Sequence, residues 1–230
     1  MTLKILGIIA KWLFILCLPI LLLSASLAWA LNSHWLYNYG FEKYSLPQTP
    51  ELAEFDLEEI GDEIISYFNS GEEPLSITVI IDGEPTQLFT PEETIHFRDV
   101  KGLVWLDYWL LGGTLAYALA YAAVSLFWRR KKYWRKLAWG LVIGGGLTLG
   151  LMLALGLGTL LGFDRLFWNF HLLFFSNEFW LAGGYMTLLF TEEFFYDAAL
   201  FCALGTAGMA VILGGVGGGW LIFNRKRAKA

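Results

Sequence analysis

Four long apolar segments constrain this chain more than any other feature, because each is long enough to cross a lipid bilayer as a helix. About 20 apolar residues span roughly 30 Å of hydrocarbon at about 1.5 Å per residue. Charged residues make up only 16% of the sequence, against about 25% in ordinary globular domains. The expected spans cover residues 5–31, 103–127, 137–161 and 198–223. We therefore expect an all-α polytopic membrane protein.

The basic residues indicate how the spans are oriented. Twelve of the sixteen lysines and arginines lie at or before the first span, in the link 128–136, or after the fourth span. Cytoplasmic segments of membrane proteins carry an excess of Lys and Arg. We therefore expect both termini in the cytoplasm and the loops 32–102 and 162–197 outside. The basic link is also expected to contact anionic headgroups of membrane lipids.

Residues 1–30 could also be read as a signal peptide, since Ala28-Trp29-Ala30 has the small-x-small pattern of a cleavage site. Cleavage would leave three spans and place the new N-terminus outside. The apolar run is longer than a typical signal core, so we expect an uncleaved first helix. The predicted organisation is then as follows: 1–31, first span; 32–102, extracytoplasmic domain; 103–161, second and third spans; 162–197, aromatic outer segment; 198–230, fourth span and basic tail.

The spans carry no signature of a cofactor. Cys17 and Cys202 both lie within apolar segments, so a disulfide is not expected, and no Cys-His cluster suggests a metal site. Glycine runs at 144–146 and 217–219 favour close helix packing. No Gly-Lys-Ser/Thr follows them, so a phosphate-binding loop is excluded. We expect no cofactor, no metal and no nucleic-acid partner, and the oligomeric state is not indicated.

The first outer loop begins with signals for a helix. Asp56 is a good N-cap, with Glu59 three residues later, and Gly71 is placed to stop the helix. Between them, apolar residues recur at helical spacing: Leu57, Ile60, Ile64 and Phe68. A first helix is therefore predicted over about 57–70.

A hairpin and a second helix follow in the same loop. Residues 77–81 and 86–89 favour strands, and Asp82-Gly83 between them is typical of a hairpin turn. Thr90-Pro91-Glu92-Glu93 forms a capping box with proline at the first helical position. The loop thus predicts a small α+β extracytoplasmic domain of helix, β-hairpin and helix. We expect it to rest on the membrane surface or on the second outer loop, with a purely structural role left open.

The segment 163–180 combines eight aromatic residues with several polar ones, which is typical of the boundary between hydrocarbon and water. It carries His171, and Asp164 lies seven residues earlier on the same predicted helical face. His96 and Asp99 are likewise three apart on one face. A carboxylate beside an imidazole can fix its tautomer and raise its basicity. His34 has no acid near it in the sequence and is expected to be an interfacial residue.

These patterns occur in the same order in a known family. The segments are Leu36-Tyr-Asn-Tyr-Gly-Phe41, Gly71-Glu-Glu-Pro74, His96-x-x-Asp-Val-Lys101, Phe170-His-x-x-Phe-Phe-x-Asn177 with Trp180, and Glu192-Glu-Phe-Phe195. Over nearly its whole length the chain resembles the bacterial four-span membrane protein family that includes the lipoprotein intramolecular transacylase, Lit. It departs from the pattern after Trp180, where Leu181-Ala-Gly-Gly-Tyr185 stands in place of Asp-Pro and a further acid, and at Thr191, where proline is expected.

The resemblance implies an enzyme of the bacterial plasma membrane with an extracytoplasmic active site. Its substrate would be a diacylglyceryl lipoprotein, and one acyl chain would move from the glycerol ester to the α-amine of the N-terminal cysteine. His96 and His171 would be the catalytic residues. Helical spacing and the chemistry of the reaction add Asp99, Asp164 and Asn177 as expected supporting residues. The substrate pocket is expected to include the following residues: Phe170, Phe174, Phe175, Trp180 and Glu193. Glu193 has a second reading as a helix-capping acid.

Histidine acid–base chemistry suits this reaction, because an imidazole titrates near neutral pH. We expect His171 to accept the amine proton, His96 with Asp99 to protonate the leaving oxygen, and Asn177 to stabilise the oxyanion. The two histidine roles could be exchanged, or one histidine could be acylated as a nucleophile. Two other functions remain open. One is a metal-dependent lipid hydrolase with His96, Asp99 and His171 as ligands. The other is a non-catalytic envelope sensor or assembly protein.

Overall fold

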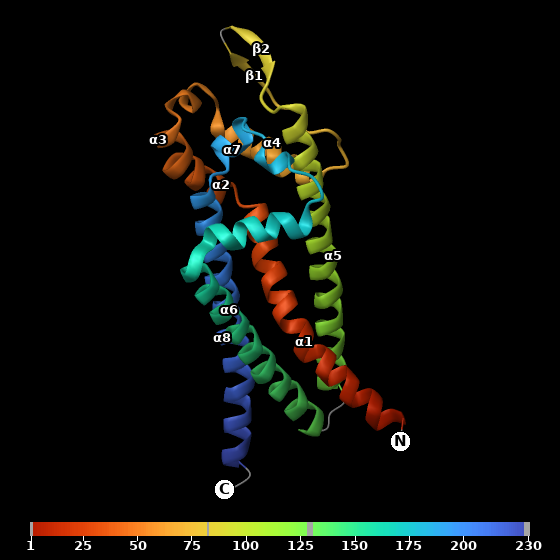
Figure 1. Cartoon of the computed structure of the whole chain (residues 1–230). Helices are drawn as coiled ribbons and strands as arrows, with labels where there is room; N and C mark the ends of the chain where they lie inside the picture. Colours follow the sequence, from red (N-terminus) through yellow and green to blue (C-terminus); the bar gives the residue numbers. More distant parts are fainter. Residues whose placement is uncertain (1, 82, 128–130, 228–230) are drawn as a thin grey trace. The chain divides into compact units, whose positions relative to one another are not determined.

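The computed structural model describes residues 2–81, 83–127 and 131–227 and is built mainly of helices (Figure 1). Within the described residues, four helices are long and apolar enough to cross a membrane. They are α1 (Thr2–Leu31), α5 (Pro91–Phe127), α6 (Lys131–Phe174) and α8 (Glu192–Arg227). The expected four-helix membrane fold is therefore confirmed. Asp82, Arg129 and Arg130, which take part in the predicted turn and basic link, lie outside the described residues.

The chain forms two compact units. The first contains Met1–Leu27, Asp107–Leu157 and Cys202–Ala230, which include large parts of the four long helices. Glycines allow these helices to pack closely. A Cβ on Gly145 would lie 2.9 Å from the carbonyl oxygen of Ala210, and one on Gly217 would lie 2.6 Å from that of Ala138. Real side chains do not approach backbone oxygens so closely, so the glycine runs serve helix packing as expected.

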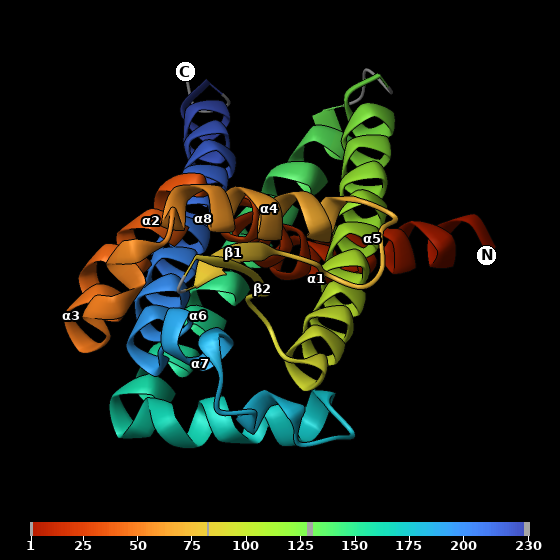
Figure 2. The same cartoon turned by 90° about the horizontal axis from the view of Figure 1, so that it is seen from above.

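The second unit contains Ala28–Leu106 and Gly158–Phe201, which are the loops and the adjoining helix ends. It opens with a series of short helical segments that no local sequence pattern predicts. They are α2 (His34–Gly40), the π-helical η1 (Phe41–Ser45), α3 (Leu46–Gln48) and the 3₁₀-helical η2 (Pro50–Glu54). The predicted helix follows as α4 (Leu57–Asn69) and lies beside α2 (Figure 2). Asp56 caps α4 as predicted, since its Oδ1 accepts a hydrogen bond from the Glu59 N–H at 3.0 Å.

The predicted hairpin is also present. Strands β1 (Thr78–Ile81) and β2 (Glu84–Gln87) pair antiparallel, with Ile81 opposite Glu84. Gly83 in the turn has φ +84°, a left-handed conformation that favours glycine. The capping box then starts α5. The Glu93 N–H donates to Thr90 Oγ1 at 3.3 Å, and the Thr90 N–H donates to Glu93 Oε2 at 2.8 Å.

A kink divides α6 at Gly162, where φ is +148° and the backbone is not helical (Figure 1). Only glycine adopts this conformation readily. The kink falls where we expect the third span to end, and the stretch 163–174 beyond it belongs to the second unit. The 3₁₀ turn η3 (Phe179–Leu181) and the short helix α7 (Tyr185–Leu189) lie in the connection between α6 and α8.

Candidate active site

The second unit brings His96 and His171 together. His96 lies on the second turn of α5, and His171 lies on the last turn of α6. Their ring centroids are 6.1 Å apart, with an angle of 24° between the planes. Each residue is only 7% exposed. Two histidines separated by 75 residues in the sequence therefore share one buried site.

The tautomer of His171 follows from its hydrogen bond. Its Nδ1 lies 2.7 Å from the backbone carbonyl oxygen of Phe167. A carbonyl oxygen can only accept, so Nδ1 carries the hydrogen. In the neutral ring, the free lone pair is then on Nε2. His171 is thus prepared to accept a proton through Nε2.

Aromatic rings surround His171. Its ring centroid lies 4.3 Å from that of Phe167, 4.6 Å from that of Trp180 and 5.5 Å from that of Phe175. Phe175 also contacts His96, with centroids 4.7 Å apart. The rings pack against both imidazoles and cover them from solvent on these sides.

An amide–carboxylate bridge lies next to His96. Asn177 Nδ2 donates a hydrogen bond to Asp99 Oδ2 at 2.8 Å, and Asn177 Oδ1 accepts one from the Phe179 N–H at 3.1 Å. Asp99 is on α5 three residues after His96, whereas Asn177 follows α6 and precedes Trp180. The bridge therefore connects the two elements that carry the histidines.

In the part of the chain that the structure describes, neither histidine is hydrogen-bonded to its expected carboxylate partner. Burial and the neighbouring His171 lower the pKa of His96 to about 4, and the Asp99 carboxylate opposes this lowering. Nδ1 of His96 is buried and has no hydrogen-bond partner, while the Asp99 carboxylate is bonded to Asn177. Asp164 is exposed. Seven residues correspond to about 10 Å along a helix, too far for contact between Asp164 and His171, whereas the carbonyl at the i−4 position is within reach. Asn177, expected as an oxyanion donor, uses one of its two amide hydrogens for Asp99.

The predicted pocket residues differ in how close they lie to the histidines. Trp180 is buried against His171, and Phe175 touches both histidine rings. Phe170 and Phe174 pack against each other at 4.8 Å and are about half exposed. Glu193 is exposed on the first turn of α8.

Three polar residues of this region do not stand out as site residues in the sequence. Glu93 is completely buried, although the capping box predicts only a helix start. Lys101 is 5% exposed; its Nζ donates to the Glu72 carbonyl oxygen at 2.7 Å and lies 4.0 Å from the centre of the Tyr67 ring. Burial, with a smaller contribution from the Glu73 carboxylate, raises the pKa of Tyr67. Of the three, Lys101 is part of the family-like segment His96–Lys101, which is the only sequence signal for it.

His34 has an acidic partner after all. No acid is near it in the sequence, but its Nδ1 contacts Asp62 Oδ1 on α4. The acid is 28 residues away in the sequence, so only the fold brings it close. Both side chains are more than half exposed.

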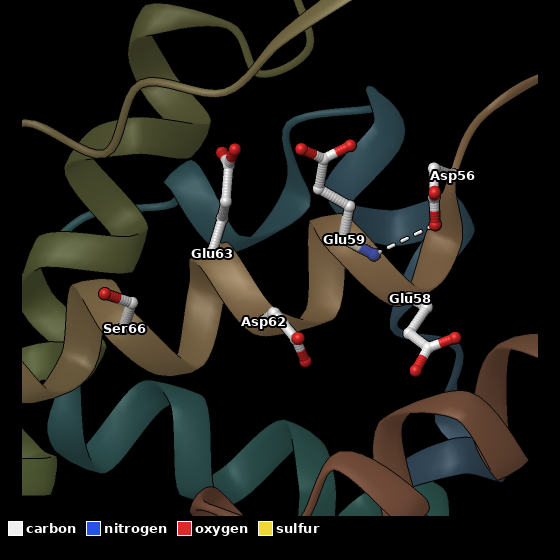
Figure 3. Close-up of a pocket in the computed structure, with 6 residues that line it drawn as sticks. All are labelled: Asp56, Glu58, Glu59, Asp62, Glu63 and Ser66. Atoms are coloured by element: carbon white, nitrogen blue, oxygen red, sulfur yellow. Dashed lines mark hydrogen bonds between the residues drawn. The ribbon is translucent and has the colours of Figure 1, made fainter.

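A hollow along α4 is lined by carboxylates. Its residues are Asp56, Glu58, Glu59, Asp62, Glu63 and Ser66 (Figure 3). In Figure 3, Glu59 and Glu63 extend to one side of the helix, and Glu58 and Asp62 extend to the other. Burial and the neighbouring Glu59 carboxylate raise the pKa of Glu63. The hollow holds no histidine and is separate from the paired-histidine site.

The described residues contain no group of three His, Cys, Asp or Glu side chains that could hold a metal ion. The ligand set His96, Asp99 and His171 is therefore not assembled. Its acidic member is bonded to an amide instead.

The fold and the site define a class: a polytopic membrane protein with two buried histidines in an aromatic enclosure. The family model for lipoprotein intramolecular transacylase Lit matches residues 12–195. The chain belongs to this family and is an enzyme of the transacylase class. No curated protein matches the sequence.

Solved structures support the fold assignment. The chain is similar to the membrane-integral lipoprotein intramolecular transacylase Lit from Bacillus cereus, with a TM-score of 0.76 and 20% identity, covering 99% of this chain and 100% of that one. Two variants of that protein, each with one histidine replaced, are also similar. The alanine variant gives a TM-score of 0.72 at 20% identity, covering 98% and 100% of the two chains. The arginine variant gives 0.67 at 22% identity, covering 100% and 98%.

Proposed function

We propose that the enzyme moves one acyl chain of a diacylglyceryl lipoprotein from the glycerol ester to the α-amine of its N-terminal cysteine. The amide C–N bond forms, the ester C–O bond breaks, and the amine proton ends on the glycerol oxygen. The product is a lyso-form lipoprotein. Conversion of an ester to an amide runs downhill, so no ATP is needed. Family membership and the paired histidines support this reaction.

The observation that carries the mechanism is the His171–Phe167 hydrogen bond. It fixes the proton on Nδ1, and a neutral His171 therefore offers Nε2 as a base. The α-amine of the substrate has a reference pKa near 8 and is mostly charged at neutral pH, so it needs a base to become a nucleophile. General-base catalysis by a positioned histidine contributes roughly 10²–10⁴-fold. We assign proton removal from the attacking amine to Nε2 of His171.

His96 is assigned the return of a proton to the glycerol oxygen. The proton that His171 takes from the amine then replaces the one lost by His96, so that one proton in all moves from nitrogen to oxygen. Its ring lies in the same aromatic enclosure as that of His171, and no described group is hydrogen-bonded to its Nδ1. The second amide hydrogen of Asn177 is assigned to the tetrahedral oxyanion, while Asp99 holds the Asn177 side chain. Amine and ester belong to one molecule, so correct binding alone supplies a large effective concentration. Phe170, Phe174, Phe175 and Trp180 would line the path of the acyl chains.

The positive-inside distribution of Lys and Arg supports a bacterial plasma-membrane location with both termini in the cytoplasm. The histidines come from the two outer loops and their adjoining helix ends, so the active site is assigned to the extracytoplasmic side. Membrane lipids would surround the spans.

Mass spectrometry of a reporter lipoprotein tests the function. The reporter is expressed with and without this gene in a host that leaves the cysteine amine free, and its N-terminal peptide is fragmented. We expect unchanged mass, with one acyl chain on nitrogen and one on glycerol. Loss of an acyl chain with a free amine would instead indicate a lipase. An unmodified reporter beside a membrane-inserted protein would contradict catalysis. The His171→Ala variant, expressed at the same level, is the matched control.

A further inference from the structure

Glu93 joins two parts of the second unit through one buried carboxylate. Its Oε2 accepts the N–H of Thr90 at 2.8 Å, and its Oε1 accepts the N–H of Met186 at 2.8 Å. Thr90 precedes α5, whereas Met186 lies in the first turn of α7. The side chain is 0% exposed. A single carboxylate thus ties the start of the His96 helix to the segment that follows Trp180.

The chain leaves space for this contact at Gly184. A Cβ there would lie 2.5 Å from Oε1 and 2.6 Å from Oε2 of Glu93. Any other residue at this position would push the carboxylate away from the Met186 N–H. Gly184 falls in the stretch 181–185, where the sequence departs from the family-like pattern.

Helix capping does not account for the burial of Glu93. Glu59 occupies the same third position in α4, yet it is exposed. A buried carboxylate is costly unless it is paired or fully hydrogen-bonded. Among the described residues no cation forms an ion pair with Glu93, and its bonded donors are the two backbone N–H groups. The burial is therefore explained by the connection that it makes and not by the helix start.

That connection bears on the distance between the two histidines. Glu93 is one turn before His96 on α5, and Met186 is six residues after Trp180, whose ring lies 4.6 Å from that of His171. We propose that Glu93 is a positioning residue that keeps His96 and the Trp180–His171 pair in register for acyl transfer. This inference rests on the histidine mechanism proposed above. Glu93 is hydrogen-bonded to backbone N–H groups and therefore acts on the imidazoles through the backbone.

The test compares four variants in the full-length protein with the reporter lipoprotein as substrate. Glu93→Gln removes one acceptor, because an amide has a single oxygen, and Gly184→Ala displaces the same carboxylate from the other side. Thr90→Ala removes the other half of the capping box but leaves the Met186 bond in place. Glu92→Gln removes an exposed charge from the same turn. For each variant, kcat, KM, thermal unfolding and hydrogen exchange at the Met186 amide are measured.

We expect Glu93→Gln and Gly184→Ala to expose the Met186 amide to exchange and to lower kcat by about tenfold or more with KM changed less than about threefold. Thr90→Ala should lower the unfolding temperature and leave kcat near that of the wild type, and Glu92→Gln should change neither. Equal loss of kcat in Thr90→Ala at a matched unfolding temperature would overturn the positioning role. So would full kcat in Glu93→Gln with a rapidly exchanging Met186 amide.

Three further outcomes are decided in the same experiment. If Glu93→Gln cannot be recovered folded, the proposal is tested by kcat and by hydrogen exchange at the Met186 amide in Gly184→Ala. If the wild-type enzyme transfers no acyl chain, the proposed function and the positioning role fall together. If the wild type is active and Glu93→Gln and Gly184→Ala are both as active as the wild type, only the positioning role is overturned.

Discussion

The Nδ1 atom of His171 lies 2.7 Å from the backbone carbonyl oxygen of Phe167, four residues earlier on the same helix. The helix itself therefore sets the tautomer of this histidine, and no carboxylate is needed. Aromatic rings on several sides hold the imidazole in this orientation. One turn of helix at the end of α6 is thus enough to set the tautomer and orientation of this imidazole.

Two substitutions of His171 distinguish the role of its hydrogen bond from the role of its basicity. In His171→Asn the amide can still donate to the Phe167 carbonyl, but no base remains. We expect a loss of roughly 10²–10⁴-fold in the N-acylation rate for this variant and for His171→Ala. The unfolding temperature should fall less in His171→Asn than in His171→Ala. Rates come from mass spectrometry of the reporter peptide, and retained activity in both variants would disprove the base assignment.

The Asp99–Asn177 bridge can be tested by exchanging its two members. Asn177→Asp alone places two carboxylates face to face and should destabilise the protein by about 1–3 kcal/mol. Asp99→Asn alone keeps an amide–amide hydrogen bond and should cost less. The double exchange restores one amide and one carboxylate, so stability should recover substantially. Thermal unfolding of the four proteins gives the coupling, and strict additivity of the two single effects would show that the bridge does not stabilise the fold.

Local signals explain why much of the fold is predictable from the sequence. The spans follow from apolar length, and the capping box at Thr90 and the turn glycine Gly83 act over a few residues. Residues 34–54 show no comparable hydrophobic periodicity or local signal. Their short helices are held by tertiary contacts, such as the Phe194 ring against Gly40, where a Cβ would lie 1.9 Å from Cδ2. Such an approach cannot be read from the sequence.

The sequence predicts the two histidines of the site but not the hydrogen-bonding partners of the site residues. Residues that share a helical face were expected to pair, yet Asp99 bonds to Asn177, 78 residues away. His34 likewise finds Asp62 through the fold. Glu93 satisfies a local capping rule, and only the structure shows its second bond to Met186. Helical spacing restricts which residues can meet, and the competition between possible partners is decided by tertiary packing.

Tyr67→Phe should leave the protein as stable as the wild type or slightly more stable. The hydroxyl oxygen of Tyr67 is buried without a hydrogen-bond partner among the described residues, so its removal loses no bond and relieves a desolvation cost. The ring remains in place beneath the Lys101 ammonium, 4.0 Å away. Lys101→Met is the contrasting variant, since it removes both this contact and the bond to the Glu72 carbonyl. A marked drop in unfolding temperature for Tyr67→Phe would reveal a bond that the hydroxyl makes.

Glu63→Gln should stabilise the second unit at neutral pH and have no such effect in acid. Burial and the Glu59 carboxylate raise the pKa of Glu63 in the folded state, so the folded protein binds this proton more tightly than the unfolded chain. The ionised carboxylate is therefore unfavourable above its folded-state pKa. The penalty disappears as pH falls below about 4, the ordinary glutamate value, where Glu63 is protonated in both states. Unfolding temperatures of wild type and variant should accordingly converge as the pH is lowered, whereas Glu54→Gln, an exposed change outside the hollow, should follow the wild type throughout. A constant difference between wild type and Glu63→Gln across this range would contradict the raised pKa.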